Sequence, residues 1–358
     1  MEAAKAGAGA RTGWSVSKLS TRERIRYVVL AVLLFVVLFG VPAWLSNYWI
    51  DVLTLVAVYS IVALGLGILM GRVGLVSLGQ ISVLALGAWV AARIFYATSL
   101  PFPVVLLCAG LITGVLGTLI GLPALRLSGL YLALITLMLA GAITVALTVT
   151  NFPNGGEGFL GHQDTDAGSD AIRRPSLGGS DAAYFRYAAI FTILMFLIAL
   201  WHVRSKPGRA WVAIRQSEPA ALAAGVNVTL YKLWAFALAS FMTGVAGGLL
   251  GGSVGKLYTY QFPTRESIIL LAVVLMGGIY SLWGALVAGA LMRLLPALLD
   301  NWGLPADLLT ILFGVGILQV LLTAPAGLAV QFPKDMKNLG GLIMRLARRR
   351  SPAQESAE

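Results

Sequence analysis

Long apolar runs, broken by short polar or glycine-rich segments, extend along most of the chain. A helix needs about 20 apolar residues to cross the hydrocarbon core of a bilayer. Runs of about that length lie at 27–46, 50–70, 75–97, 103–122, 130–150, 186–203, 232–252, 265–281, 284–300 and 306–323. The pattern therefore predicts an all-α protein, a polytopic transmembrane helical bundle of about ten spans.

Three of these runs have ambiguous readings. The run at 27–46 follows three arginines, as in a secretory signal peptide, but it is long for one and no A-x-A cleavage site follows it. We expect an uncleaved first span. The eighth and ninth runs contain Gly277, Gly278 and Gly284. These glycines fit two spans, one broken helix or a re-entrant pair.

The composition points to lipid as the main solvent of this chain. Of its 358 residues, 58% are hydrophobic and 11% are charged, whereas a soluble domain carries about 25% charged residues. The net charge of +11 would suggest nucleic acid on a soluble chain. Here the Lys and Arg residues fall in clusters between apolar runs, and few aromatic residues lie among them. That distribution fits membrane orientation better than nucleic-acid binding.

Lys and Arg also predict the orientation. With the N-terminus inside, the segments facing the cytosol hold 19 of them and the opposite segments hold five. Arg93 and Arg293 sit within or near span ends, where snorkelling is the default explanation. The positive-inside rule then places both termini in the cytosol. We expect a cytosolic N-terminal tail at 1–26, a transmembrane domain at 27–325 with an outside loop at 151–185, and a basic cytosolic C-terminal tail at 326–358.

The sequence shows no constellation of catalytic, cofactor-binding or metal-ligating residues. Cys108 is the single cysteine and lies in an apolar run, while His162 and His202 stand apart. The segment GGSVGKL at 251–257 lacks the first glycine and the closing Ser or Thr of a P-loop. The acidic residues of the 151–185 loop lack EF-hand spacing. We expect neither an enzyme nor a metal site.

Polar residues at membrane depth mark a candidate pathway. In GRVGLVSLGQIS, Ser77 and Gln80 stand at the start of a predicted span. Such side chains need partners, so they either bridge neighbouring helices or line a wet cavity. Tyr131 and Thr136 fall on a later predicted helix, where Tyr131 is most simply an interfacial anchor. The candidate pathway residues are therefore Ser77, Gln80, Tyr131 and Thr136.

One basic loop, at 204–231, is predicted to be helical and cytosolic. Ser217 is a good N-cap, Glu218 suits the helix dipole and Pro219 is tolerated in the first turn. A run of alanines follows, and Gly225 ends it. A small-sided surface of this kind lets another protein approach closely. The alternative is an amphipathic helix lying on anionic lipid.

These segments together resemble the permeases of bacterial ABC importers for branched-chain amino acids, in particular the M-type subunit of the leucine/isoleucine/valine system. The resemblance covers roughly residues 28–325 and rests on a combination of motifs. They are GLVSLGQ, SGLYLALITL, NGGEGF, LMGGIYSLWGALVAGAL and RAWVAIRQSEPAALAAGVNVTLYKLWAFALASFMTGVAGGL.

The resemblance implies one chain of a larger importer in the bacterial cytoplasmic membrane. Two related permease chains form the pore, two cytosolic ATPases drive it, and a periplasmic or lipid-anchored binding protein delivers substrate. This chain would then be a transport subunit without a cofactor of its own. The short cytosolic helix would be the coupling helix that docks an ATPase. Its candidate docking residues are Arg215, Ser217, Glu218, Ala221, Ala224, Gly225 and Asn227.

Departures from the family pattern leave the substrate open. Met138–Gly141 stands where an acidic residue is common, and Tyr280 and Trp283 stand where smaller or turn-forming residues are usual. Related systems carry urea, short amides or aromatic acids. Two other classes remain as alternatives. A secondary transporter predicts ionisable residues in span centres, and a membrane enzyme predicts paired carboxylates or a histidine cluster.

Overall fold

The computed structural model describes residues 36–122, 127, 129–149, 172, 174–175, 178–304, 306–323, 327–329 and 331. Within this part of the chain every regular element is helical, which confirms the all-α prediction. The elements are η2 (Val36–Gly40), α2 (Val41–Trp44), α3 (Asn47–Gly67), η3 (Ile68–Val73), α4 (Gln80–Ala97), α5 (Phe102–Gly121), α6 (Gly129–Val149), α7 (Asp181–Arg204), α8 (Lys206–Gln216), α9 (Glu218–Ala223), α10 (Val228–Val254), η6 (Thr259–Gln261), α11 (Arg265–Gly277), α12 (Leu282–Asn301) and α13 (Ala306–Thr323).

Seven helical segments of the described chain are long and apolar enough to cross a membrane. They are Asn47–Val73, Gln80–Ala97, Phe102–Gly121, Gly129–Val149, Asp181–Arg204, Val228–Val254 and Leu282–Asn301. Residues 27–35 of the predicted span at 27–46 lie outside the described residues. The count of ten spans therefore stays a prediction.

The span predicted at 265–281 is shorter in the structure. Its helix, α11, ends at Gly277 after 13 residues, a length of about 20 Å at 1.5 Å per residue. Gly278 has a φ of +110°, so the chain leaves the helix there and turns into α12. The glycines noted in the sequence thus end one short helix and begin a long one.

Two other predicted boundaries also need correction. The helix expected from residue 75 begins at Gln80, because Gly74 adopts a φ of +87° and residues 74–79 are not helical. The outside loop expected to reach residue 185 ends earlier, because Ser180 caps α7 by accepting a hydrogen bond from the Ala183 N–H. Most of that loop lies outside the described residues.

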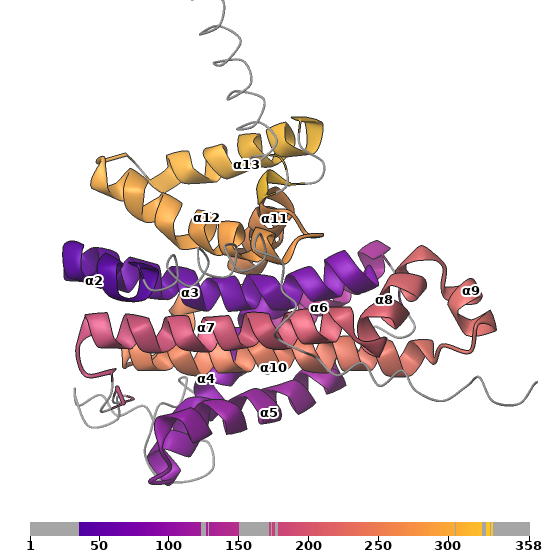
Figure 1. Ribbon diagram of the computed structural model, residues 1–358, viewed down its shortest axis with the longest axis horizontal. Coiled ribbons are helices and arrows are strands. Elements are labelled where there is room, and N and C mark those ends of the chain that lie inside the picture. The colour runs from indigo at the N-terminus through magenta and orange to yellow at the C-terminus, as the bar shows by residue number, and fades with distance from the viewer. Residues whose placement is uncertain are drawn as a thin grey trace, which may run out of the picture. The chain divides into compact units, whose positions relative to one another are not determined.

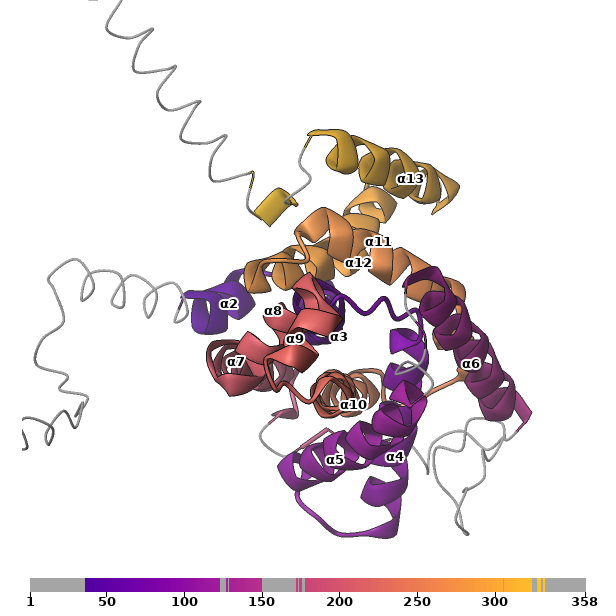
Figure 2. The same ribbon diagram turned by 90° about the vertical axis from the view of Figure 1, so that its right-hand side faces the viewer.

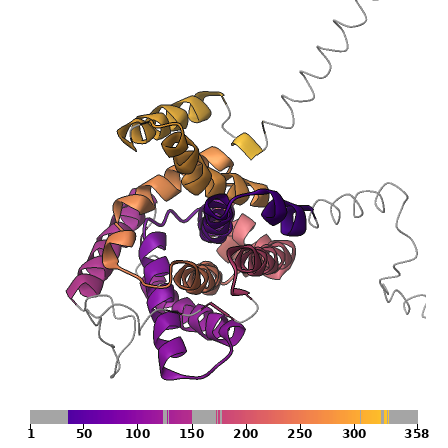
Figure 3. The same cartoon turned by 90° about the vertical axis from the view of Figure 1, so that its left-hand side faces the viewer.

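Residues from Ser46 onward form one compact unit, and residues up to Leu45, which include η2 and α2, form another. In the larger unit α3, α7 and α10 run side by side, with α5 on one side and α12 on the other (Figure 1). Helix α10 packs on α3, α4 and α5, while α3 packs on α7 and α12. Viewed from the end opposite α8 and α9, α3, α7 and α10 are adjacent and nearly end-on (Figure 3).

Small residues make the contacts of α10 close. A Cβ atom on Gly244 would lie 2.6 Å from the Thr113 Cβ, and one on Gly247 would lie 2.5 Å from the Ala88 nitrogen. The glycines of α5 meet α10 in the same way, since a Cβ on Gly117 would lie 1.8 Å from the Ser240 Oγ. These glycines therefore let α5 and α10 pack closely against each other. Helices α8 and α9 project from one end of this bundle (Figure 2).

Candidate functional site

Local sequence fixes the short helix α9 at both ends. The Ser217 hydroxyl accepts a hydrogen bond from the Ala220 N–H, 3.4 Å away, and thus caps its start. At its end, Gly225 adopts a φ of +79°. The Gly225 N–H donates to the Leu222 carbonyl and the Val226 N–H donates to the Ala221 carbonyl, both at 2.9 Å. This pair of bonds is a Schellman motif. The helix predicted from the caps is therefore present.

The chain enters α10 through a third cap. The Asn227 side chain accepts a hydrogen bond from the Leu230 N–H at 3.0 Å and begins the long helix. Glu218, in the first turn of α9, forms a 2.5 Å ion pair with Lys232 in α10. Lys232 is buried and Glu218 is half-exposed. The pair ties α9 to α10, so α9 is held as a rigid projection.

The two faces of α9 differ from what the alanine run suggested. Ala221 is only 2% exposed and packs in the core, so its side chain supports the helix from below. Leu222 is 60% exposed, and Ala223 and Ala224 are also exposed. The exposed surface of α9 and its C-cap therefore includes Leu222, Ala223 and Ala224 beside the first-turn residues 218–220. Leu222 was not singled out from the sequence. An exposed leucine between two alanines could have been found, because it breaks the small-residue pattern.

Arg215 points away from α9 and toward the membrane helices. Its guanidinium donates a 2.7 Å hydrogen bond to the Gly71 carbonyl at the end of η3. The same group lies over the Tyr280 ring, with 4.4 Å between Cζ and the ring centroid. Of the predicted docking residues, Arg215 thus faces the bundle, whereas Ser217, Gly225 and Asn227 shape the backbone.

Three of the predicted pathway residues lie along a polar seam between the start of α4, α6 and α10. The Thr136 hydroxyl accepts a 2.9 Å hydrogen bond from the Leu78 N–H, next to Ser77. Gln80 is 2% exposed, and its Oε1 lies 3.0 Å from the Thr243 hydroxyl. The seam joins the non-helical stretch before α4 to α6 and α10. Its hydrogen bonds are those of polar groups that bridge helices in this conformation.

Tyr131 lies apart from that seam. Its side chain is 73% exposed on α6, which agrees with an anchor or contact position at the surface of this chain. Ser77, Gln80 and Thr136 therefore lie along this seam, each bonded to a separate partner, and Tyr131 lies outside it.

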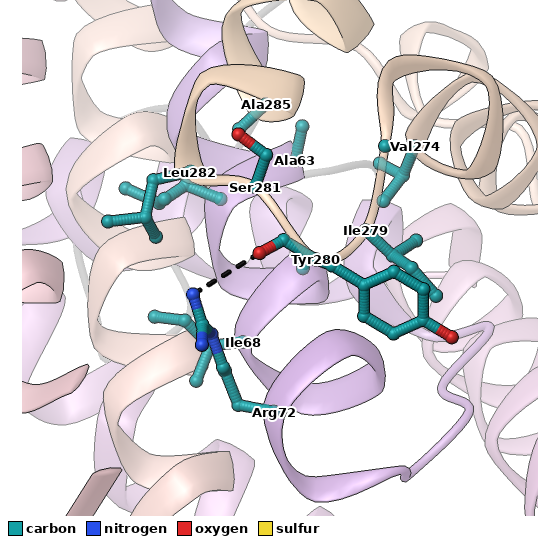
Figure 4. Close-up of a pocket in the computed structure, with 12 residues that line it drawn as sticks. Ala63, Ile68, Arg72, Val274, Ile279, Tyr280, Ser281, Leu282 and Ala285 are labelled. Carbon is teal, nitrogen blue, oxygen red and sulfur yellow. Dashed lines mark hydrogen bonds between the residues drawn. The ribbon is translucent and has the colours of Figure 1, made fainter. Parts of the chain in front are cut away.

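A small cavity lies at the end of α3 near the α11–α12 turn. Arg72, Ile68 and Tyr280 are among its lining residues, and Arg72 donates a 3.2 Å hydrogen bond to the Tyr280 carbonyl (Figure 4). Its volume of about 10 Å³ is close to that of a single water molecule. A cavity of this size is too small to hold an amino acid.

The snorkelling expected of Arg293 is wrong. Arg293 lies well inside α12, where its guanidinium forms a 3.3 Å ion pair with Glu266 of α11. It also contacts the Tyr59 hydroxyl and lies over the Tyr59 ring, 4.0 Å from its centroid. Tyr59 is 1% exposed in α3. The charge is satisfied by an internal partner from another helix, which no local pattern around Arg293 could reveal.

The geometry so far defines a helical membrane protein with a rigid projecting helix, a polar seam and an internal ion pair. The family model for the permease component of branched-chain amino acid transport systems matches residues 48–321. The chain belongs to that family and is therefore a transport permease component.

Curated relatives agree with this assignment. The chain is 31% identical to the high-affinity branched-chain amino acid transport system permease protein LivM of Salmonella typhimurium, over 72% of this chain and 65% of the relative. It is 30% identical to the LivM protein of Escherichia coli, over 75% and 67%. It thus spans about two thirds of the length of these relatives. It is also 25% identical to the ribose import permease protein RbsC of Haemophilus influenzae, over 75% and 82%. No solved structure matches the chain.

The internal ion pair gives a stability prediction. Replacing Arg293→Gln leaves the Glu266 carboxylate partly buried without its cation, and loss of one partner of a buried pair costs about 3 kcal/mol. We expect a lower melting temperature and a lower yield of the purified protein. The double variant Glu266→Gln/Arg293→Gln removes both charges and should recover most of the loss. Arg209→Gln, on the exposed surface of α8, is the control. A double variant as unstable as the single one would contradict a charge-pairing role.

Proposed function

We propose that this chain is the permease subunit of an ATP-driven ABC importer for branched-chain or other hydrophobic amino acids. It forms half of the membrane pathway and docks a cytosolic ATPase through α9, its coupling helix. The observation that carries the proposal is the outward face of α9. A helix capped at both ends and tied to α10 presents Leu222 to solvent at the basic end of the bundle. Membership of the branched-chain permease family supports it.

The other subunits of the importer follow from that role. We infer a second related permease chain in a heterodimer, two ATPases that carry out ATP hydrolysis, and a periplasmic or lipid-anchored binding protein. This chain needs no cofactor. It lies in the bacterial cytoplasmic membrane with about ten spans, and the distribution of Lys and Arg favours cytosolic termini.

Two alternatives are separable by experiment. A permease of the sister urea or short-amide importer would use the same coupling helix with another substrate. A secondary transporter driven by an ion gradient would use ionisable groups inside the membrane, and the Arg293–Glu266 pair is the observation that favours it. In our proposal that pair is structural.

The decisive experiment reconstitutes the chain with its cognate partners in liposomes. We expect ATP-dependent uptake of labelled leucine, with less or no uptake of urea or an aromatic acid. Uptake of urea without leucine would assign the sister importer. Uptake driven by a proton gradient, without any ATPase, would overturn the proposal.

Docking is tested by a change on the outward face of α9. Leu222→Asp places a charge on a surface that packs closely, and an unpaired charge in such an interface costs several kcal/mol. We expect the ATPase to be lost from the purified complex and uptake to be abolished, while insertion of the chain is unchanged. The matched control is Thr229→Asp, an exposed position in the first turn of α10 where an acid is favoured. Normal ATPase binding by Leu222→Asp would mean that α9 lies on lipid.

Thiol labelling tests on which side of the membrane α9 lies. In a Cys108→Ser background, Ala223→Cys should react with an impermeant thiol reagent only from the cytosolic side, because Ala223 is exposed. Tyr260→Cys, at a highly exposed position beyond the other end of α10, should react from the opposite side. Reaction of both from one side would reject this orientation.

We also propose that Ser77, Gln80 and Thr136 mark the translocation pathway, with Tyr131 at its margin. In the described conformation Gln80 bonds Thr243 of α10 and Thr136 bonds the Leu78 N–H, and both would exchange these bonds for water or substrate when the pathway opens. The Thr243 hydroxyl retains the Ala239 carbonyl as a second partner 2.8 Å away. A change at Gln80 therefore leaves no hydroxyl stranded.

Gln80→Leu tests the pathway role. We expect complex assembly to be normal and leucine uptake to fall about tenfold, the effect of about 1.4 kcal/mol on the rate-limiting barrier. Leucine binding to the partner binding protein should not change. Ser82→Ala is the control, because Ser82 is equally buried on the same helix and bonds only the Ala140 carbonyl among the interactions described. Wild-type uptake by Gln80→Leu would mean that Gln80 only joins helices and does not line the pathway.

A further inference from the structure

Two segments far apart in the sequence meet beside the coupling helix. Arg215 is in the last turn of α8, two residues before the Ser217 cap of α9. Tyr280 is in the turn between α11 and α12, which begins at Gly278 and ends at Ser281. Their side chains stack, with the guanidinium 4.4 Å from the ring centroid. A cation over a tyrosine face is attracted by the ring quadrupole.

Buried contacts of α8 hold Arg215 in place. Trp211, one turn earlier on the same face, is fully buried and donates a 2.8 Å hydrogen bond to the Tyr231 carbonyl in α10. Ile214 is also buried. Helix α8 packs on η3 and α10 as well as on α9. A movement of α9 is therefore passed to α8 as a whole, and Arg215 moves with it.

The turn that carries Tyr280 is seated against the end of α3. A Cβ atom on Gly71 would lie 1.9 Å from the Ile279 carbonyl oxygen, so the two backbones are in direct contact. Two arginines hold Tyr280 from this side. Arg215 covers its ring and bonds the Gly71 carbonyl, while Arg72 donates to the Tyr280 carbonyl at 3.2 Å (Figure 4).

This turn also borders the narrow cavity at the end of α3. Ile279, Tyr280 and Ser281 line one side of it, and Ile68 and Arg72 of η3 line the other (Figure 4). A shift of the turn would therefore change the gap between the α11–α12 pair and α3. Packed contacts of this kind switch between discrete arrangements and do not deform continuously.

We propose that the stack of Arg215 on Tyr280 transmits movement of the coupling helix to the α11–α12 turn and so links ATP hydrolysis to opening of the pathway. Tyr280 is a positioning residue that acts through Arg215. This inference rests on the proposed function. It adds the path by which the force of the ATPase reaches the membrane helices.

The test uses the complete transporter in liposomes and measures three quantities: ATPase bound to the complex, ATP hydrolysed and leucine taken up. In Tyr280→Ala and Arg215→Gln, α9 is unchanged, so the ATPase should remain bound and ATP should still be hydrolysed. Leucine taken up per ATP should fall about fivefold, which corresponds to the loss of one cation–π contact at an exposed site. Tyr280→Phe keeps the ring and should behave as wild type.

Controls separate the contact from general damage. Trp283→Ala removes another exposed aromatic ring from the start of α12, and Arg209→Gln removes another exposed charge from α8. Both should keep the wild-type ratio. In a double-mutant cycle, Arg215→Gln/Tyr280→Ala should be no worse than Arg215→Gln alone, since Arg215→Gln already removes the contact that Tyr280→Ala removes. If Tyr280→Ala lowers the yield, Arg215→Gln carries the test alone, because it changes an exposed side chain.

The inference is overturned by a wild-type ratio of leucine to ATP in Arg215→Gln, or by additive losses of that ratio in the double variant. Loss of the bound ATPase in Arg215→Gln also overturns it, because Arg215 would then belong to the docking surface. Failure of the proposed function is distinct. It shows in the wild-type arm, as an absence of bound ATPase or of ATP-dependent uptake before any variant is compared.

Discussion

The close approach of α10 to α4 and α5 is the constraint on which the rest of the bundle depends. Apolar side chains gain little by leaving lipid for protein, so helix association in a membrane relies on van der Waals contact and internal hydrogen bonds. Gly244 and Gly247 let the α10 backbone touch its neighbours. Gly87 of α4 sits directly against Gly244, because a Cβ atom on Gly87 would lie 2.5 Å from the Gly244 Cα. That proximity brings Thr243 to Gln80 and so creates the polar seam.

The end of the bundle that carries α8 and α9 depends on the same helix. Helix α10 supplies Lys232, which pairs with Glu218, and the Tyr231 carbonyl, which bonds Trp211. Both α8 and α9 are therefore anchored to α10, which runs through the bundle. A small helix held in this way can present Leu222 in a defined place and can also transfer a displacement without absorbing it. Rigidity of the projecting end and close packing within the membrane have a common origin.

Local rules predicted the parts of the site that depend on neighbours in sequence. The Ser217 cap and the Gly225 ending could be predicted because their partners lie within one or two turns. Long-range partners could not be predicted. The pairing of Arg293 with Glu266 needs the packing of α11 on α12, and its contact with Tyr59 needs α3 as well. The inward position of Ala221 likewise depends on α8 and α10, so alanine content alone misidentified the outward face.

The bond between Gln80 and Thr243 joins residues that are 163 positions apart. A ribosome adds about 5–20 residues per second, so α4 enters the membrane about 10–30 s before its partner has been synthesised. During that interval the amide of Gln80 and the glycine faces of α4 and α5 have only temporary partners, such as lipid headgroups, water or the insertion machinery. The first half of the bundle therefore becomes stable only when α10 arrives. A chain stopped before α10 would be a substrate for membrane proteases even though its own spans were complete.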